Sequence, residues 1–504
     1  MPRSGEPVAC PTMRLRNLLL LCLLSACAAA PLDPQPRRRP NIVFILADDH
    51  AAQALGAYGS TSAHTPNLDR LAAQGLRFDN AFCGNAICSP ARASVLTGLH
   101  SHAHGVVDNA ARFDGALPTF PKALGAAGYR TALVGKWHLK SDPTGFDHWE
   151  VFPDQGEYYD PVLVSPRGKR TVSGYTSEVV TDLALEWLEQ QRGGDAPFLL
   201  CLNHKAPHRS WAPGPRELEL YAGEQLPEPA TLFDDYSTRA AGAAAQEMSV
   251  ARHLSEYDLK LGAPHARGEA ALAAWRRAYD AENAALARQP LEGDARTRWN
   301  YQRYAKDYLR CVAGVDASVG RVLEWLEREG LADDTLVIYA SDQGFFVGEH
   351  GWYDKRWMYE ESLRLPLIVR WPGVIGPGRV EERLVQNIDL APTLCDVAGA
   401  APLPNVHGTS LLPLLEGRTP RAWRSSIYYR YFEYPEPHRV EPHYGVRTER
   451  HKLIEFPRIG ARELYDLERD PHELHNLAGH SEHRALEARL SEELARLRRE
   501  FGDA

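Results

Sequence analysis

The stretch Asn41-Ile42-Val43-Phe44-Ile45-Leu46-Ala47 decides the fold, and Asp48 and Asp49 follow it directly. A near-continuous apolar run of this length is typical of a strand buried on both faces of a parallel sheet. Helical patterns such as 177–191 and 304–328 separate it from further apolar runs, at residues 131–134, 197–202, 335–340 and 365–369. Because strands alternate with helices, we predict an α/β sandwich whose functional residues follow the carboxyl ends of strands.

The overall composition restricts the class of protein. The chain has 504 residues, enough for a large domain plus a smaller one. It is 44% hydrophobic and 24% charged, as expected for a globular protein. The net charge of -9 argues against nucleic acid as a partner, because phosphate binding requires a basic face. An anionic substrate would therefore need a local basic pocket.

Residues 1–27 are predicted to form a targeting segment. Basic residues precede an apolar run, 18–24, that is too short to span a bilayer. The run ends in Leu24-Ser25-Ala26-Cys27, which resembles a bacterial lipobox with Cys27 as the lipidated residue. The other interpretation is ordinary signal cleavage among residues 28–30. In both cases we expect export to the bacterial cell envelope or periplasm, with residues 28–40 as a tether and a lipid anchor as the one membrane attachment.

Composition divides the rest of the chain into three parts. We predict a catalytic domain over residues 41–423 that contains a helical insertion, rich in Ala, Arg and Glu, over 213–300. Beyond it, short strand patterns and a charged helix predict a smaller α+β domain over 424–504. Its expected elements are strands at 427–432, 445–448, 452–456 and 463–467 and a helix at 481–501.

Four oxygen-bearing side chains predict a cation site. Asp48 and Asp49 are adjacent carboxylates at a strand end, a repelling pair that implies either a cation or a solvated turn. Asp342 and Gln343 follow another predicted strand and add a carboxylate and an amide oxygen. Ligands that are all oxygen suit a hard divalent ion such as Ca²⁺, and Mg²⁺ would also be satisfied.

A cysteine at a predicted helix start and basic residues after a predicted strand form further motifs. In Cys88-Ser89-Pro90-Ala91-Arg92, Cys88 is expected to open a helix whose N-terminus favours an anion. Gly135-Lys136-Trp137-His138 places Lys136 and His138 on one side of an extended segment. Taken singly, these residues would be a buried thiol, a solvated lysine and a packed histidine.

These ordered motifs, from about residue 41 to 477, resemble the type I, formylglycine-dependent sulfatases. Cys-x-Pro-x-Arg at 88–92 matches the signal at which a formylglycine-generating maturase oxidises the cysteine to an aldehyde, 3-oxoalanine. The resemblance implies an alkaline-phosphatase-like fold, a large mixed sheet sandwiched by helices with a smaller C-terminal α+β domain. It also implies that Cys83 and Cys88 do not pair, because a disulfide would consume the nucleophile precursor. We expect the remaining thiols to be buried and inert, namely Cys201, Cys311 and Cys395.

The resemblance also implies a role for each site residue. The metal ligands would be the residue at position 88 and the four oxygen-bearing side chains Asp48, Asp49, Asp342 and Gln343. Gln343 departs from the family, which more often has His or Asn there. Sulfate oxygens would be bound by the three cations Arg92, Lys136 and Lys355. His138 would deprotonate the aldehyde hydrate, and His208 would protonate the leaving alcohol.

The substrate class comes from two longer matches. Asn203–His208 and Asp354–Ser362 most resemble exported bacterial glycan sulfatases, including N-acetylglucosamine-6-sulfatases that act in glycosaminoglycan or mucin degradation. We therefore predict a sulfated glycan as substrate, with iduronate, N-sulfoglucosamine and galactose sulfates as alternatives. Gln155–Asp160 and Trp211 either stack on the sugar or pack within the loops.

The sequence also allows two other functions. A phosphonate or phosphate monoester hydrolase of the same superfamily would share the metal site. A non-catalytic glycan-binding protein would be favoured if Cys88 stays a thiol.

Overall fold

The computed structural model describes residues 39–435 and 437–503, and those from Arg39 on belong to one compact unit. The predicted signal segment, the lipobox with Cys27 and most of the tether lie outside the described residues. Among the helices of the described residues, none combines the length and the apolar character needed to cross a membrane.

A ten-stranded mixed sheet organises the unit, in the order β13-β2-β12-β9-β1-β8-β4-β5-β6-β7. Its strands are β1 Asn41–Ala47, β2 Leu76–Phe78, β4 Arg130–Gly135, β5 His148–Val151, β6 Val162–Ser165, β7 Gly168–Thr171, β8 Phe198–Asn203, β9 Thr335–Ser341, β12 Leu367–Arg370 and β13 Arg379–Glu381. The central strands from β9 to β5 are parallel. β12, predicted from an apolar run like that of β1, instead pairs antiparallel with β9.

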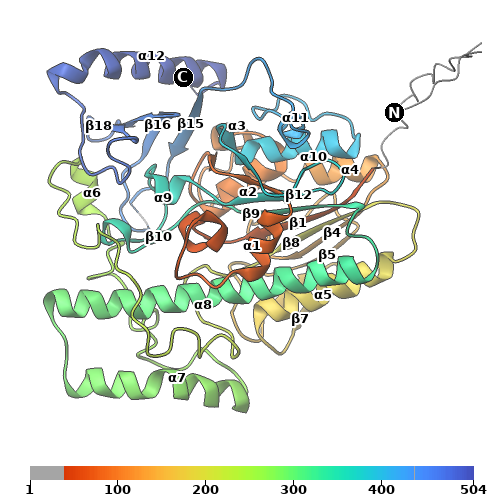
Figure 1. Ribbon diagram of the computed structural model, residues 1–504, viewed down its shortest axis with the longest axis horizontal. Coiled ribbons are helices and arrows are strands. Elements are labelled where there is room, and N and C mark those ends of the chain that lie inside the picture. Colours follow the sequence, from red (N-terminus) through yellow and green to blue (C-terminus); the bar gives the residue numbers. More distant parts are fainter. Residues whose placement is uncertain (1–38, 436, 504) are drawn as a thin grey trace, which may run out of the picture. The chain divides into compact units, whose positions relative to one another are not determined.

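Helices cover both faces of this sheet. Figure 1 shows α5 and α8 along one face and α2, α4 and α10 along the other. The helices are α1 Pro66–Ala73, α2 Cys88–Thr97, α3 Ser101–His104, α4 Phe120–Ala126, α5 Thr176–Gln191, α6 Ala241–Ala245, α7 Glu269–Arg288, α8 Gly293–Arg328, α9 Glu360–Leu363, α10 Leu390–Ala398, α11 Leu412–Leu415 and α12 Arg484–Glu500. Short 3₁₀ turns lie at Ala52–Ala54, Gly56–Tyr58, Glu349–Gly351, Asn387–Asp389 and Ser481–His483. The predicted sandwich is confirmed.

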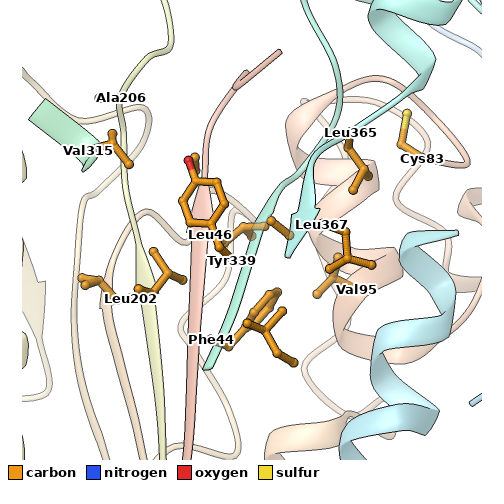
Figure 2. Close-up of a cluster of buried hydrophobic side chains, with 14 of the residues drawn as sticks. Phe44, Leu46, Cys83, Val95, Leu202, Ala206, Val315, Tyr339, Leu365 and Leu367 are labelled. Atoms are coloured by element: carbon orange, nitrogen blue, oxygen red, sulfur yellow. The ribbon is translucent and has the colours of Figure 1, made fainter. Parts of the chain in front are cut away.

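The core lies between these layers. β1 is buried along six of its seven residues, which explains its continuous apolar sequence. Figure 2 shows Val315 of α8 and Val95 of α2 on opposite sides of the strands that carry Phe44, Leu46 and Tyr339. Burial on both faces fixes the strand ends where the candidate site residues follow.

A second, antiparallel sheet lies at the C-terminal end of the chain. Its strands are β15 Ser426–Tyr431, β16 His443–Thr448, β17 His451–Phe456 and β18 Ala461–Asp466, in that order. α12 packs on this sheet through Leu490, Leu494 and Leu497. Two-stranded ribbons join β10 Phe346–Val347 to β11 Tyr353–Asp354 and β14 Val385–Gln386 to β3 Ala81–Phe82.

The segment predicted as a helical insertion, 213–300, contains α6, α7 and the first turns of α8. α8 begins at Gly293, well before the start at residue 304 that periodicity indicated. The stretch before α7 is mostly turns, although many of its side chains are buried.

Candidate active site

Four neighbouring strands bring the candidate site residues to one edge of the sheet. The order β9-β1-β8-β4 places the segments that carry Asp342, Asp48, His208 and Lys136 side by side. In parallel strands these carboxyl ends meet on the same side of the sheet, so residues far apart in sequence become neighbours.

Two glycines allow the close approaches that build this edge. Gly135 has φ 104°, and a Cβ there would lie 2.0 Å from the carbonyl oxygen of Asn203. Gly344 would place a Cβ 2.2 Å from the carbonyl oxygen of Glu361. Both contacts are with backbone atoms and cannot be relieved by a side-chain movement, so glycine is required directly before Lys136 and directly after Gln343.

Three buried carboxylates form the centre of the site. Asp48, Asp49 and Asp342 are 0% exposed, and their ligand oxygens lie within 4.8 Å of one another. Burial raises the pKa of Asp342 to about 8 and that of Asp49 to about 6. For Asp48 burial acts in the same direction, but the charges of Lys136, His208, Arg92 and Lys355 hold its pKa well below the ordinary value. Such a cluster needs a cation or strong pairing to stay ionised.

Three cations touch these carboxylates. The Arg92 guanidinium lies 3.0 Å from Asp342 Oδ2 and 3.4 Å from Asp48 Oδ1. Lys136 Nζ contacts Asp48 Oδ2, and Lys355 Nζ lies 2.7 Å from Asp49 Oδ2. Although burial disfavours its charge, Asp354 and Asp49 raise the pKa of Lys355 well above the ordinary value.

The donor set fits a hard divalent ion. Gln343 donates from its amide to Asp49 Oδ1, while its own Oε1 is buried and has no hydrogen-bond partner among the described residues. A buried amide oxygen without a partner costs free energy that a cation would recover. Oxygen from three carboxylates and this amide is a ligand set that suits Ca²⁺ or Mg²⁺.

Cys88 opens α2 beside the carboxylates, as predicted. Its Sγ lies 3.2 Å from Asp48 Oδ1 and 3.9 Å from Gln343 Nε2, and the residue is 0% exposed. Burial, followed by the charge of Asp48, raises the pKa of this thiol. An unmodified Cys88 is therefore a protonated thiol and a poor nucleophile. Cys83 and Cys88 are both unpaired, and Cys201, Cys311 and Cys395 are buried free thiols, as expected.

His138 reaches the start of the helix rather than the cysteine. Its Nδ1 lies 3.3 Å from Ser89 Oγ, and its Nε2 lies 3.2 Å from the carboxylate of Asp154. Burial and the charge of Lys136 lower the pKa of His138 to about 4. The imidazole is thus neutral near pH 7, with Nδ1 as the proton-accepting atom if Nε2 donates to Asp154.

His208 lies close to Asp48 and Cys88, with ligand atoms of the three residues within 4.8 Å of one another. Its Nε2 is 3.8 Å from Asp49 Oδ2, and its Nδ1 lies 2.7 Å from the carbonyl oxygen of Arg209, to which it donates. Burial and the charge of Lys136 lower the pKa of His208 well below the ordinary value. An anion bound nearby would oppose both effects and favour the protonated ring.

A cavity of about 600 Å³ extends from His208 away from the carboxylates. Its inner end is lined by Lys205 and Tyr158, where the lysine ammonium lies 5.0 Å from the tyrosine ring centre. Burial lowers the pKa of Lys205 to about 8. Lys205, Ser89 and Asp154 were not among the predicted site residues, because their contacts depend on how separate loops meet.

The structure decides between the two interpretations that the sequence left open for Trp211, in favour of packing. Trp211 is 0% exposed and packs against Tyr304, so it cannot stack on a sugar. Glu360 pairs with the buried Lys452 at 2.9 Å and with Arg447 at 3.1 Å, and Glu361 faces His350 at 3.6 Å.

The chain was compared with known proteins. The family model described as Sulfatase matches residues 40–400. The chain belongs to the sulfatase family. A second model, N-sulphoglucosamine sulphohydrolase, C-terminal, matches residues 348–500 of this sulfatase.

Individual relatives cover nearly the whole sulfatase. It is 43% identical to the N-acetylglucosamine-6-O-sulfatase of Bacteroides thetaiotaomicron over 96% of this chain and 91% of the relative. It is 28% identical to the human N-acetylglucosamine-6-sulfatase over 85% of this chain and 73% of the relative. Among solved structures, BT4656 in complex with its substrate D-glucosamine-2-N,6-O-disulfate matches with a TM-score of 0.90 and 42% identity, covering 92% of this chain and 99% of that one. The phosphonate monoester hydrolase of Agrobacterium radiobacter matches with a TM-score of 0.69 and 25% identity, covering 92% and 96%. The alkaline-phosphatase-like fold class is confirmed.

Proposed function

We propose that this sulfatase hydrolyses the 6-O-sulfate of N-acetylglucosamine in a glycan. The observation that carries the proposal is the 43% identity over 96% of the chain to an enzyme of that name. The site supports it, because three buried cations converge on Cys88 and the carboxylates beside it. A sulfate monoester is a compact anion that such a pocket can accept.

Two groups supply chemistry that the unmodified side chains lack. Formylglycine, if formed from Cys88 by a maturase, would supply a nucleophilic oxygen as its hydrate. Asp48, Asp49, Asp342 and Gln343 would hold a calcium or magnesium ion, which would supply positive charge to the site.

The other residues bind the substrate and move protons. Arg92, Lys136 and Lys355 donate to sulfate oxygens and offset negative charge as the ester bond breaks. His208 gives a proton to the leaving alcohol oxygen, since the bound sulfate raises its affinity for a proton. His138 accepts a proton at Nδ1, and Asp154 holds that ring through Nε2. These roles follow the chemistry of the family and the distances between the side chains.

The test is sulfate release from N-acetylglucosamine-6-sulfate, run beside galactose, iduronate and N-sulfoglucosamine sulfates. We expect selective release from the first and none by Cys88→Ala, with the same melting temperature as the wild type. Mass spectrometry of the peptide that contains Ser89 checks maturation. Activity of Cys88→Ala within tenfold of wild type would refute the mechanism, and release from another sugar alone would refute the specificity.

A second candidate function is phosphonate or phosphate monoester hydrolysis. It is favoured by the likeness in fold to the Agrobacterium hydrolase. Comparing the 6-sulfate and the 6-phosphate of one sugar separates the two candidates. A non-catalytic glycan-binding role would be favoured if residue 88 of protein from its native host were still a thiol.

We also infer the organisation of the full chain from its sequence. Residues 1–27 form a signal peptide with a lipobox, 41–423 the catalytic domain and 424–504 a smaller domain. Labelling with a fatty acid, lost in Cys27→Ser, would test for the lipid anchor.

A further inference from the structure

The cavity that begins at His208 is placed to receive the alcohol part of the substrate. His208 and Lys205 line its inner end, whereas the lining does not include Cys88, Asp48 or Asp49. The cavity therefore extends from the leaving-group side of the site. Its volume of about 600 Å³ is in the range that encloses a drug-sized ligand.

The outer part of the cavity carries an aromatic platform. Tyr257 lines it and is 54% exposed. One face of its ring stacks on His265, with ring centres 3.7 Å apart and planes 21° apart. His265 in turn stacks on Trp275 at 5.2 Å and 20°. Since one face of Tyr257 is covered, its exposure belongs to the other face and the edge of the ring.

The buried side chains of His265 and Trp275 support the ring of Tyr257. His265 is 7% exposed and Trp275 2% exposed. The His265 Nε2 lies 3.1 Å from the carbonyl oxygen of Tyr257, and its Nδ1 lies 3.3 Å from Ser210 Oγ. Hydrogen bonds at both ring nitrogens fix the histidine, so the tyrosine ring is ordered before a ligand arrives. Such pre-ordering lowers the entropy lost on binding.

Some charged groups beside the platform are paired within the protein, and others can bind a ligand. Arg209 and Asp258 form an ion pair of 2.5 Å with each other. Arg267 lines the same cavity and donates from Nη1 to the carbonyl oxygens of Pro264 and Ala266. Glu157 and Asp160 line the same cavity, but among the described residues Arg267 forms no ion pair, which leaves its other N–H groups for a ligand.

We propose that this cavity binds the sugar linked to the sulfated residue, with Tyr257 stacking on that sugar and Arg267 hydrogen-bonding to it. The inference rests on the proposed function and makes a sulfated oligosaccharide a better substrate than a monosaccharide. The C–H groups on one face of a pyranose ring pack on an aromatic ring, and guanidinium donors match its hydroxyl or acidic substituents.

The experiment compares two substrates in the matured protein. One is N-acetylglucosamine-6-sulfate, and the other is a β-1,4-linked N-acetylglucosamine disaccharide that is 6-sulfated on its non-reducing sugar. We expect a higher kcat/KM for the disaccharide in the wild type. Tyr257→Ala should reduce that advantage about tenfold, mainly through KM, and leave kcat/KM for the monosaccharide within twofold. Tyr257→Phe keeps the ring and should retain the advantage.

Phe233→Ala is the matched control, since Phe233 lies in the same segment, is 44% exposed and is outside the cavity lining. Arg267→Ala gives a second test that leaves the aromatic stack intact. Equal kcat/KM for the two substrates in the wild type, or an unchanged preference in both Tyr257→Ala and Arg267→Ala, would overturn the proposal.

A binding measurement separates this proposal from the proposed function. Calorimetric titration of the desulfated disaccharide into Cys88→Ala and into Cys88→Ala/Tyr257→Ala requires no turnover. Weaker binding in the double variant, with no sulfatase activity in the wild type, would retain the subsite and reject the reaction. Equal binding in both would reject the subsite, whatever the activity.

Discussion

Replacing Lys452 by methionine should destabilise the protein strongly, although this residue is not in the active site. Lys452 is 0% exposed, and its Nζ lies 2.9 Å from Glu360 and 2.8 Å from Glu473. It also donates to the carbonyl oxygen of Met358 at 2.7 Å. The substitution leaves Glu473, which is 0% exposed, without this partner, whereas Glu360 is partly exposed and keeps Arg447 at 3.1 Å. Removing one partner of a buried pair costs about 3–5 kcal/mol.

The expected change in melting temperature follows from the size of the compact unit. An unfolding entropy of about 2.1 cal/mol/K per residue gives roughly 1 kcal/mol/K for the residues from Arg39 to the C-terminus. Lys452→Met should therefore lower the melting temperature by about 3–5 °C in calorimetry. Lys169→Met, at an exposed lysine of β7, is the matched control and should change it by less than about 1 °C.

The loss should also depend on pH. Burial raises the pKa of Glu473 to about 7, above the ordinary value of 4.5. A carboxyl whose folded pKa is raised destabilises the protein increasingly as pH rises. Without Lys452 the pKa of Glu473 rises further. The loss in free energy of unfolding caused by Lys452→Met should therefore grow between pH 6 and pH 8. Glu473→Gln in the same protein should recover part of it. A deficit equal to that of Lys169→Met, or one independent of pH, would refute the reasoning.

Three further outcomes are expected. His208→Asn should lower kcat on a sugar sulfate by about 10²–10⁴, but much less on 4-nitrophenyl sulfate, whose leaving group needs no proton; equal losses would contradict the assigned role. Chelation by EDTA should lower the melting temperature of the wild type. Calcium at about 100 times its Kd should restore about 2.7 kcal/mol of the free energy of unfolding. The Asp342→Asn variant should respond to neither treatment. Burial lowers the pKa of His443 from 6.5 to about 4, so its contribution to stability is complete above pH 6.5 and is lost as pH falls towards 4. In urea titrations over this pH range, His443→Gln should lose less stability than the wild type. Equal losses in the two proteins would contradict this assignment.

Strands and their ends could be predicted from the sequence because burial on two faces leaves a local signal. β1 is apolar from Ile42 to Ala47, and Asp48 and Asp49 follow its end. The start of α2 was also predictable, since Pro90 fits only the first turn of a helix. Asp48, Lys136 and Asp342 were indicated by their places after strands, whereas Arg92 and Lys355 were recognised through the resemblance to sulfatases.

Contacts between loops could not be predicted in this way. Trp211 has no periodic neighbours to indicate that its ring is buried. α8 begins at Gly293, and tertiary packing buries polar residues of its first turns such as Thr297 and Asn300. Because these buried residues are polar, the sequence shows no apolar periodicity there. Glu360 meets Lys452 only because the antiparallel sheet packs against α9, and no local pattern encodes that meeting.

The burial of Cys88 determines whether its oxidation can occur before or after folding. In the native fold the side chain is 0% exposed at the start of a helix, so an enzyme could not reach it there. If Cys88 is oxidised to formylglycine, as proposed above, the oxidation would precede closure of the β1–α2 region, and the maturase would compete with folding in time. Purified, folded protein that still carries the thiol should resist later conversion. Slowing synthesis or folding should raise the fraction of active molecules, a yield set by kinetics and not by stability.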